Sequence, residues 1–190
     1  MNFITEQFSQ TLEIKQSKFI AYLAPYEAYD TLLHILKNEH PKARHFVTAS
    51  RYLNEYDQIV ESSSDDGEPK GTSGKPSLMV LQGQDIINAA VIIVRYFGGT
   101  KLGTGGLVRA YSDAVNLVLQ ESEFLEYKKE RSVSIEIEYT DVRFIDYECE
   151  AFGIDIVEKY FNAKTIYKIK SDEKSLEEFL KKVQRVVKIL

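Results

Sequence analysis

Hydrophobic and polar residues recur with two different periods along the chain, and these periods predict a first set of strands and helices. Alternating or uniformly apolar stretches predict strands at residues 12–23, 45–53, 57–61 and 88–97. The alternation in the first of these changes phase at residues 16–18, which predicts a bulge. Apolar residues at helical spacing predict one helix between Pro25 and Pro41 and another after Gly106. The stretch 88–97 is apolar and β-branched, as expected for a strand buried on both faces.

A second set of elements follows a charged stretch at residues 126–130, which we interpret as a linker. The predicted order of strand, helix, strand, strand and helix is typical of a ferredoxin-like unit without its last strand. Only residues 186–190 remain to supply that strand. The helix ends and the turn between the two middle strands are predicted at Asp141, Gly153, Asn162–Ala163 and Asp172. We therefore expect an α+β protein with domains at residues 1–125 and 126–190.

Composition places the chain among ordinary globular proteins. Of 190 residues, 44% are hydrophobic and 28% charged, which argues against disorder and coiled coil. The longest aliphatic run, residues 89–94, is too short to cross a membrane, and the first residues lack the pattern of a secretory signal. The single cysteine, Cys149, forms no internal disulfide. We expect a cytoplasmic monomer without membrane contact.

The charge balance bears on nucleic-acid binding. The net charge is −5, and neither predicted domain has an excess of lysine and arginine. Binding of RNA or DNA by bulk electrostatics is therefore disfavoured, and such binding would require a local basic patch.

The first segment with candidate chemistry is residues 65–76, which crowd three carboxylates, two lysines, three glycines and two prolines into twelve positions. We expect no regular structure there. Its carboxylates could bind Mg²⁺ or share a proton, while Lys70, Ser73 and Lys75 could meet an anion. The alternative is a well-ordered loop whose charges cap neighbouring backbone, and the sequence leaves both interpretations open.

The second segment, residues 95–109, has the order strand, glycine-rich turn and helix N-terminus. This order presents free N–H groups and a positive dipole end to an anion. Standard nucleotide-binding motifs are absent, because neither a P-loop nor a G-x-G-x-x-G pattern fits these residues. The alternative is that the glycines serve tight turns and close helix–strand packing. We predict that this segment and residues 65–76 meet on one face of the first domain.

The remaining reactive residues give weak signals. No pair of histidines has metal-ligand spacing, and we expect neither a metal nor a cofactor. His45 lies at the start of a predicted strand, where a structural role is the alternative to a catalytic one. A triad of Ser73, His45 and Asp65 or Asp66 stays open, although no G-x-S-x-G motif orients the serine. Cys149 is expected in the core.

Four segments together resemble the Impact family, which includes bacterial YigZ-like proteins and eukaryotic Impact. They are residues 13–19 (EIKQSKF), 43–45 (ARH), 65–76 (DDGEPKGTSGKP) and 94–111 (VRYFGGTKLGTGGLVRAY). The resemblance implies a first domain with the ribosomal protein S5 domain 2-like fold, followed by a small ferredoxin-like domain. It also implies a link to translation, since eukaryotic relatives modulate translational control. Ser73 stands where the family usually has alanine, which argues against a family nucleophile at that position.

Three functions compete at this point. The favoured one is a translation-associated regulator that binds RNA or the ribosome, or a translation-regulating protein, without chemistry of its own. The residues expected to bind the anion are Lys70, Lys75, Arg95, Gly98, Gly99, Lys101, Gly103, Gly105, Gly106 and Arg109. The second is a hydrolase for a phosphate-containing or peptide-like substrate. Its acid–base or metal-binding candidates are His45, Asp65, Asp66 and Glu68. The third is a pure protein-binding module.

Overall fold

The computed structural model describes residues 1–161 and 163–190 and divides them into two compact units, Met1–Tyr127 and Lys128–Leu190. Strand β7 (Leu125–Glu126) pairs with β1 (Asn2–Phe3), so the stretch interpreted as a linker begins with a residue of the first unit. The second unit's first strand begins at Glu130. The turn predicted at Asn162–Ala163 includes residue 162, which lies outside the described residues.

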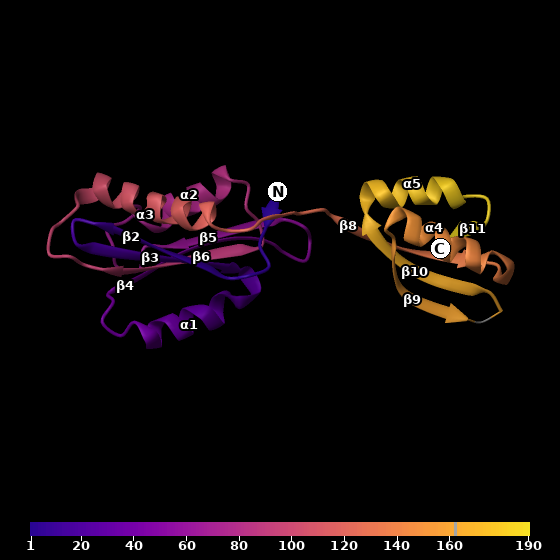
Figure 1. Ribbon diagram of the computed structural model, residues 1–190, viewed down its shortest axis with the longest axis horizontal. Coiled ribbons are helices and arrows are strands. Elements are labelled where there is room, and N and C mark those ends of the chain that lie inside the picture. Colours follow the sequence, from indigo (N-terminus) through magenta and orange to yellow (C-terminus); the bar gives the residue numbers. More distant parts are fainter. Residues whose placement is uncertain (162) are drawn as a thin grey trace. The chain divides into compact units, whose positions relative to one another are not determined.

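The first unit is a five-stranded antiparallel sheet covered by helices on both faces (Figure 1). Helix α1 lies on one face, and α2 and α3 lie on the other. The strand order is β2-β3-β6-β4-β5, and β6 is therefore central. The strands are β2 (Phe8–Ile14), β3 (Ser17–Pro25), β4 (His45–Leu53), β5 (Ile59–Ser64) and β6 (Ala89–Tyr96). The helices are α1 (Tyr29–Glu39), preceded by the 3₁₀ turn η1 (Tyr26–Ala28), α2 (Gly74–Gly83) and α3 (Gly103–Gln120).

The central strand β6 is buried on both faces, as its uniform apolar sequence predicts. Val91 and Ile93 pack into the core under α2 and α3, whereas Ile92 and Val94 pack into the core under α1. All four side chains are at most 1% exposed. Because side chains alternate along a strand, Arg95 shares the face of Val91 and Ile93. Strand β6 thus places the Arg95 guanidinium on the α3 side of the sheet.

Several features of this unit differ from the sequence predictions. Helix α3 begins at Gly103 rather than after Gly106, so Gly105 and Gly106 lie in its first turn. The change of phase at residues 16–18 marks a hairpin rather than a bulge. Lys15 and Gln16 have φ angles of 48° and 64° and join β2 to β3 as a two-residue turn, with Ile14 paired to Ser17. The segment 65–76 is also not irregular throughout, because its last three residues begin α2. Pro76 is tolerated there, since the N–H groups of a first helical turn have no intrahelical partner.

The second unit is a four-stranded antiparallel sheet in the order β11-β8-β10-β9, with two helices. Its elements are β8 (Glu130–Ile137), η2 (Tyr139–Asp141), α4 (Val142–Phe152), β9 (Asp155–Phe161), β10 (Thr165–Asp172), α5 (Glu173–Val183) and β11 (Val187–Ile189). Gly153 ends α4 with a φ of 63°, and Asp172 caps α5 by accepting a 3.0 Å bond from the Ser175 N–H. Asp141, in contrast, makes no side-chain cap. The short β11 supplies the last strand, and Cys149 lies in the core.

Among the described residues, we find no helix that is both long enough and apolar enough to span a membrane.

Candidate anion-binding site

A buried ion pair joins the two segments that the sequence singled out. Glu68 lies in the connection between β5 and α2, and Arg95 lies near the end of β6. The Arg95 Nη1 atom donates to Glu68 Oε1, and the two side chains are only 7% and 3% exposed. The prediction that the segments meet on one face is confirmed at this pair.

The ion pair is held by aromatic side chains from β3 and α3. The Tyr111 hydroxyl donates to Glu68 Oε1 at 2.8 Å, and the Arg95 guanidinium carbon lies 5.3 Å from the centre of the Phe19 ring. Phe19 and Tyr111 pack edge to face with their centres 5.1 Å apart. Burial, followed by the charge of Glu68, raises the pKa of Tyr111 above its usual value. Tyr111 therefore stays protonated and keeps donating to the carboxylate.

His45 and Asp66 connect this centre to the start of β4. The Asp66 carbonyl lies 2.8 Å from His45 Nδ1 and accepts its hydrogen, while His45 Nε2 lies 3.9 Å from Glu68 Oε1. The Asp66 carboxylate accepts the Phe46 N–H at 2.6 Å. The backbone carbonyl and the side-chain carboxylate of Asp66 thus both form hydrogen bonds between the loop and β4. His45 is placed beside the ion pair but beyond hydrogen-bond distance of it.

The Asp65 carboxylate holds together the loop between β5 and α2 by accepting hydrogen bonds from it. Its carboxylate accepts the N–H groups of Gly71, Ser73 and Gly74 at 2.7, 3.1 and 2.9 Å, and the Ser73 hydroxyl at 2.7 Å. Partial burial opposes ionisation, but these bonds more than offset it and hold the pKa of Asp65 below its usual value. Asp65 therefore acts as an ionised cap at the start of α2.

The serine triad considered from the sequence does not form. Ser73 is fully buried, and its hydroxyl donates to Asp65 instead of facing His45, whose Nδ1 is engaged by the Asp66 carbonyl. Within residues 1–161 and 163–190, no three histidine, cysteine or carboxylate side chains are grouped so that they could hold a metal ion.

A cavity of about 340 Å³ opens beside the ion pair, between the loop and the start of α3. It is lined by Glu68, Pro69, Arg95, Phe97, Lys101, Leu102, Gly103, Thr104 and Leu107. Of the predicted anion-binding residues, Arg95, Lys101 and Gly103 contribute to this lining. The side chains of Lys70, Lys75 and Arg109 are exposed but do not line it.

The glycines of the turn have different roles. A Cβ at Gly98 would lie 2.0 Å from the carbonyl carbon of Gln16, so this glycine allows the turn to pack against the β2–β3 hairpin. Gly99 and Gly103 have positive φ, and Gly106 packs tightly on Leu102. Gly105 alone among these five has an ordinary φ and open space where a Cβ would stand. The described fold gives no reason for glycine at that position.

The N-terminus of α3 opens toward the cavity without a cap. Leu102 occupies the N-cap position and makes no side-chain cap, and the first turn has no acidic residue. The first N–H groups of a helix have no intrahelical partners and carry the positive end of its dipole. With Lys101 immediately before it, this helix end is suited to bind an anion.

The sequence missed five contributors to the site. These residues line the cavity but were not selected, because their residue types carry no charge and no strong acid–base chemistry: Pro69, Phe97, Leu102, Thr104 and Leu107. The spacing of Phe97 from Arg95 was an available signal, since residues two apart on a strand share a face.

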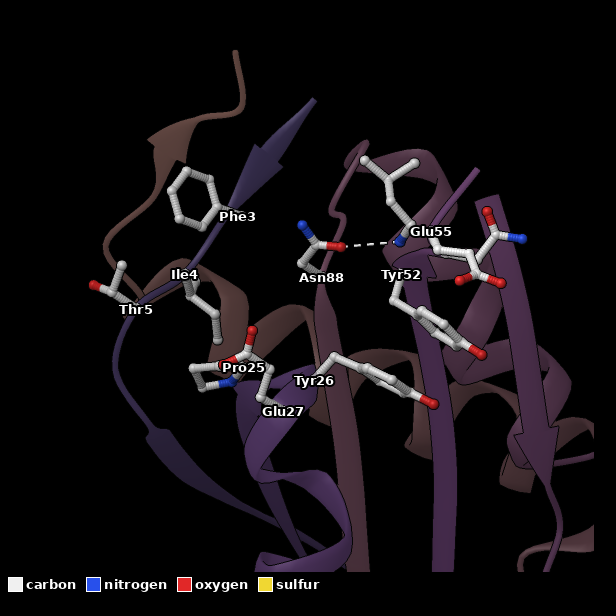
Figure 2. Close-up of a pocket in the computed structure, with 11 residues that line it drawn as sticks. Phe3, Ile4, Thr5, Pro25, Tyr26, Glu27, Tyr52, Glu55 and Asn88 are labelled. Atoms are coloured by element: carbon white, nitrogen blue, oxygen red, sulfur yellow. Dashed lines mark hydrogen bonds between the residues drawn. The ribbon is translucent and has the colours of Figure 1, made fainter. Parts of the chain in front are cut away.

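A second and larger cavity, of about 780 Å³, lies where β6 begins (Figure 2). Tyr26 and Tyr52 stack there with ring centres 3.8 Å apart, and the Asn88 side chain accepts the Leu53 N–H at 2.9 Å. The charged residues of its lining are Glu27 and Glu55, with no lysine or arginine. This acidic cavity does not suit an anion. The basic site at the other end of β6 therefore stays the candidate.

These features define a class: a mixed α+β protein whose first unit carries a glycine-rich turn over a buried Glu–Arg pair. Comparison with known proteins gives the family, because the Impact N-terminal domain model matches residues 15–119. The chain belongs to the Impact family.

Individual relatives agree with this assignment. An IMPACT family member of Haemophilus influenzae is 39% identical over 88% of this chain and 82% of its own length. The IMPACT family member YigZ of Escherichia coli is 44% identical over 57% of this chain and 55% of its own length. A crystal structure described as that of a hypothetical protein is 30% identical in sequence and has a TM-score of 0.71. The match covers 100% of this chain and 95% of the chain in that crystal structure.

Proposed function

We propose that the protein is a translation-associated regulator that binds RNA or the ribosome through the basic site at the start of α3. The observation that carries this proposal is the uncapped N-terminus of α3, which opens beside Lys101 onto the cavity. Phosphate groups bind to such helix ends through backbone N–H groups and the helix dipole. Membership of the Impact family supports the link to translation that the sequence resemblance implies.

The proposal extends to the folds of the two units. For the first unit we propose the ribosomal protein S5 domain 2-like fold, on the basis of its antiparallel sheet and α3. For the second we propose a ferredoxin-like domain, because β8, α4, β9, β10, α5 and β11 follow that order along the chain. The strand order β11-β8-β10-β9 supports this assignment.

Because the net charge of the protein is −5, RNA binding must depend on local interactions at the site. Bulk attraction to a polyanion is absent, so binding must come from a few phosphate contacts. The first-turn N–H groups supply contacts that do not depend on net charge, and Lys101 adds a cation beside them. We therefore expect a modest salt dependence that reflects few ionic contacts.

A hydrolase is the second candidate, and the proximity of His45 to the buried Glu68 carboxylate favours it. The geometry supports it less than RNA binding. Glu68 Oε1 already accepts from Arg95 and Tyr111, and the carboxylates of Asp65 and Asp66 accept backbone N–H groups of the loop and of β4. A catalytic role for these groups requires that one of them exchange its partner.

The test is the affinity for purified ribosomes and for a single-stranded RNA across a salt series. Lys101→Ala should weaken binding several-fold and lower the slope of log affinity against log salt by about one, because one phosphate contact is lost. Lys37→Ala is the matched control, since Lys37 is also exposed but lies on α1, across the sheet. Equal binding and equal slopes for the two variants would contradict the proposal.

A further inference from the structure

The cavity beside α3 has an exposed aromatic ring at its edge. Phe97 follows β6 directly, lines the cavity and is 51% exposed. The Arg95 guanidinium carbon lies 5.8 Å from the centre of this ring and 5.3 Å from that of Phe19. The ring is therefore positioned by a buried, paired arginine and still presents surface to solvent.

The rest of the lining is divided between apolar walls and one polar end. Pro69, Leu102 and Leu107 form apolar walls with Phe97, whereas Lys101 and the first turn of α3 form the polar end. The Glu68–Arg95 ion pair completes the lining. A bare phosphate would leave the apolar walls unused. A ligand that combines a flat aromatic group with an attached anion would contact both parts.

Arg95 gives a second and independent sign of a binding site. The residue is only 6% exposed, and its Nε atom is buried without a hydrogen-bond partner in the part of the chain that the structure describes. Buried donors without partners are rare in folded proteins and call for an explanation at each occurrence. Here the unpaired donor belongs to the side chain that lines the cavity and contacts Phe97.

A nucleotide is the common ligand that joins a flat aromatic ring to a phosphate. We propose that this cavity holds one unstacked nucleotide of single-stranded RNA, with its base against Phe97 and its phosphate at the first turn of α3. This inference rests on the proposed function and names the form of RNA that the site selects. Aromatic side chains stack bases of single strands regardless of sequence, whereas the bases of a duplex are already stacked and paired.

The experiment compares a short single-stranded RNA with the same strand annealed to its complement, using the full chain. The parent should bind the single strand more tightly than the duplex. Phe97→Leu should weaken single-strand binding roughly ten-fold, because the stacking surface is lost. The salt slope should stay that of the parent, since no charge is removed. Phe97→Tyr keeps a ring and should retain affinity.

The control variant is Tyr56→Leu, which removes an aromatic ring that is 72% exposed in the loop between β4 and β5. Circular dichroism and thermal unfolding establish that each variant is folded. If Phe97→Leu bound the single strand like Tyr56→Leu, or if the duplex bound as tightly as the strand, the inference would be overturned. A free nucleoside monophosphate that bound as tightly as the strand would also overturn it.

These outcomes are separable from failure of the proposed function. RNA binding that depends on Lys101 but not on Phe97 would leave the proposed function intact and overturn only the stacked nucleotide. Absence of RNA and ribosome binding by the parent would overturn both.

Discussion

At the residue scale, the Glu68–Arg95 pair is the most consequential interaction of the candidate site. Both partners are almost fully removed from water, and Tyr111 donates a further bond to the carboxylate. An intact buried pair contributes little net stability, because desolvation offsets much of the attraction. Removing one partner is different, since it leaves the other charge buried and uncompensated.

We therefore expect Glu68→Ala to lower the free energy of unfolding by about 3–5 kcal/mol. Tyr111→Phe removes one hydrogen bond to a charged group and should cost less, about 1.5–3 kcal/mol. Urea denaturation of the two variants and the parent measures both differences. A Glu68→Ala variant as stable as the parent would show that the pair is not the buried centre described above.

The sequence predicted part of this centre. The unusual composition of residues 65–76 and 95–109 marks the two segments that hold Glu68 and Arg95. For Tyr111 the sequence predicts only a position on the helix after Gly106, because its bond to Glu68 spans 43 positions and has no local signal. Phe97 was missed for a related reason. An exposed phenylalanine has the same sequence pattern as a buried one at the end of an apolar strand.

At the element scale, α2 shows where local patterns fail. The segment contains Gly74 and Pro76 in its first turn, residue types that normally argue against a helix. The carboxylate of Asp65, nine positions earlier, accepts the Gly74 N–H and so satisfies that turn from outside. A cap supplied from nine positions earlier in the same connection is invisible to a pattern that examines neighbours three or four positions apart. In contrast, the helical periodicity of α3 and the uniformly apolar run of β6 both predict their elements, because the buried faces of these two elements determine them.

The hairpin between β2 and β3 shows a second limit. The change of phase after Ile14 was visible in the sequence, but a bulge and a two-residue turn both shift the alternation. The positive φ angles of Lys15 and Gln16 identify this connection as a two-residue turn and not a bulge. Neither residue is a glycine, and the usual sequence signal for this turn was therefore absent. The close approach of Gly98 to the same hairpin explains why that position requires a glycine.

At the scale of the whole molecule, the two units have separate cores. The core clusters of the first unit contain no residue beyond Leu119, and the cluster of the second begins at Val133. The two-residue strand β7 precedes Lys128 and Lys129, and β8 follows them. Both lysines are exposed. Boundaries between domains generally fall in exposed segments of this kind.

Trypsin should therefore cleave the native protein first after Lys128 or Lys129 and leave two folded fragments. Mass spectrometry identifies the cut, and circular dichroism of the separated fragments reports whether each is folded. A single resistant core, or cleavage spread over many sites before this one, would count against two independently folded units.

The central claim is that the first turn of α3 contacts a ligand, and Gly105 tests it most directly. Its φ is ordinary, and apart from the adjacent residues and the backbone of its own helix no atom lies within 4 Å of an added Cβ. Gly105→Ala should thus stabilise the protein by about 0.4–1 kcal/mol while its methyl group obstructs the approach of a phosphate. Gly83→Ala is the matched control, because Gly83 is also helical and exposed, with open space at its Cβ.

The measurement is ribosome and RNA affinity alongside thermal unfolding for both variants. Our account predicts that Gly105→Ala unfolds at a higher temperature than the parent and binds more weakly, whereas Gly83→Ala binds like the parent. A Gly105→Ala protein that is stable and binds as tightly as Gly83→Ala would contradict the account, because the turn would then serve packing alone.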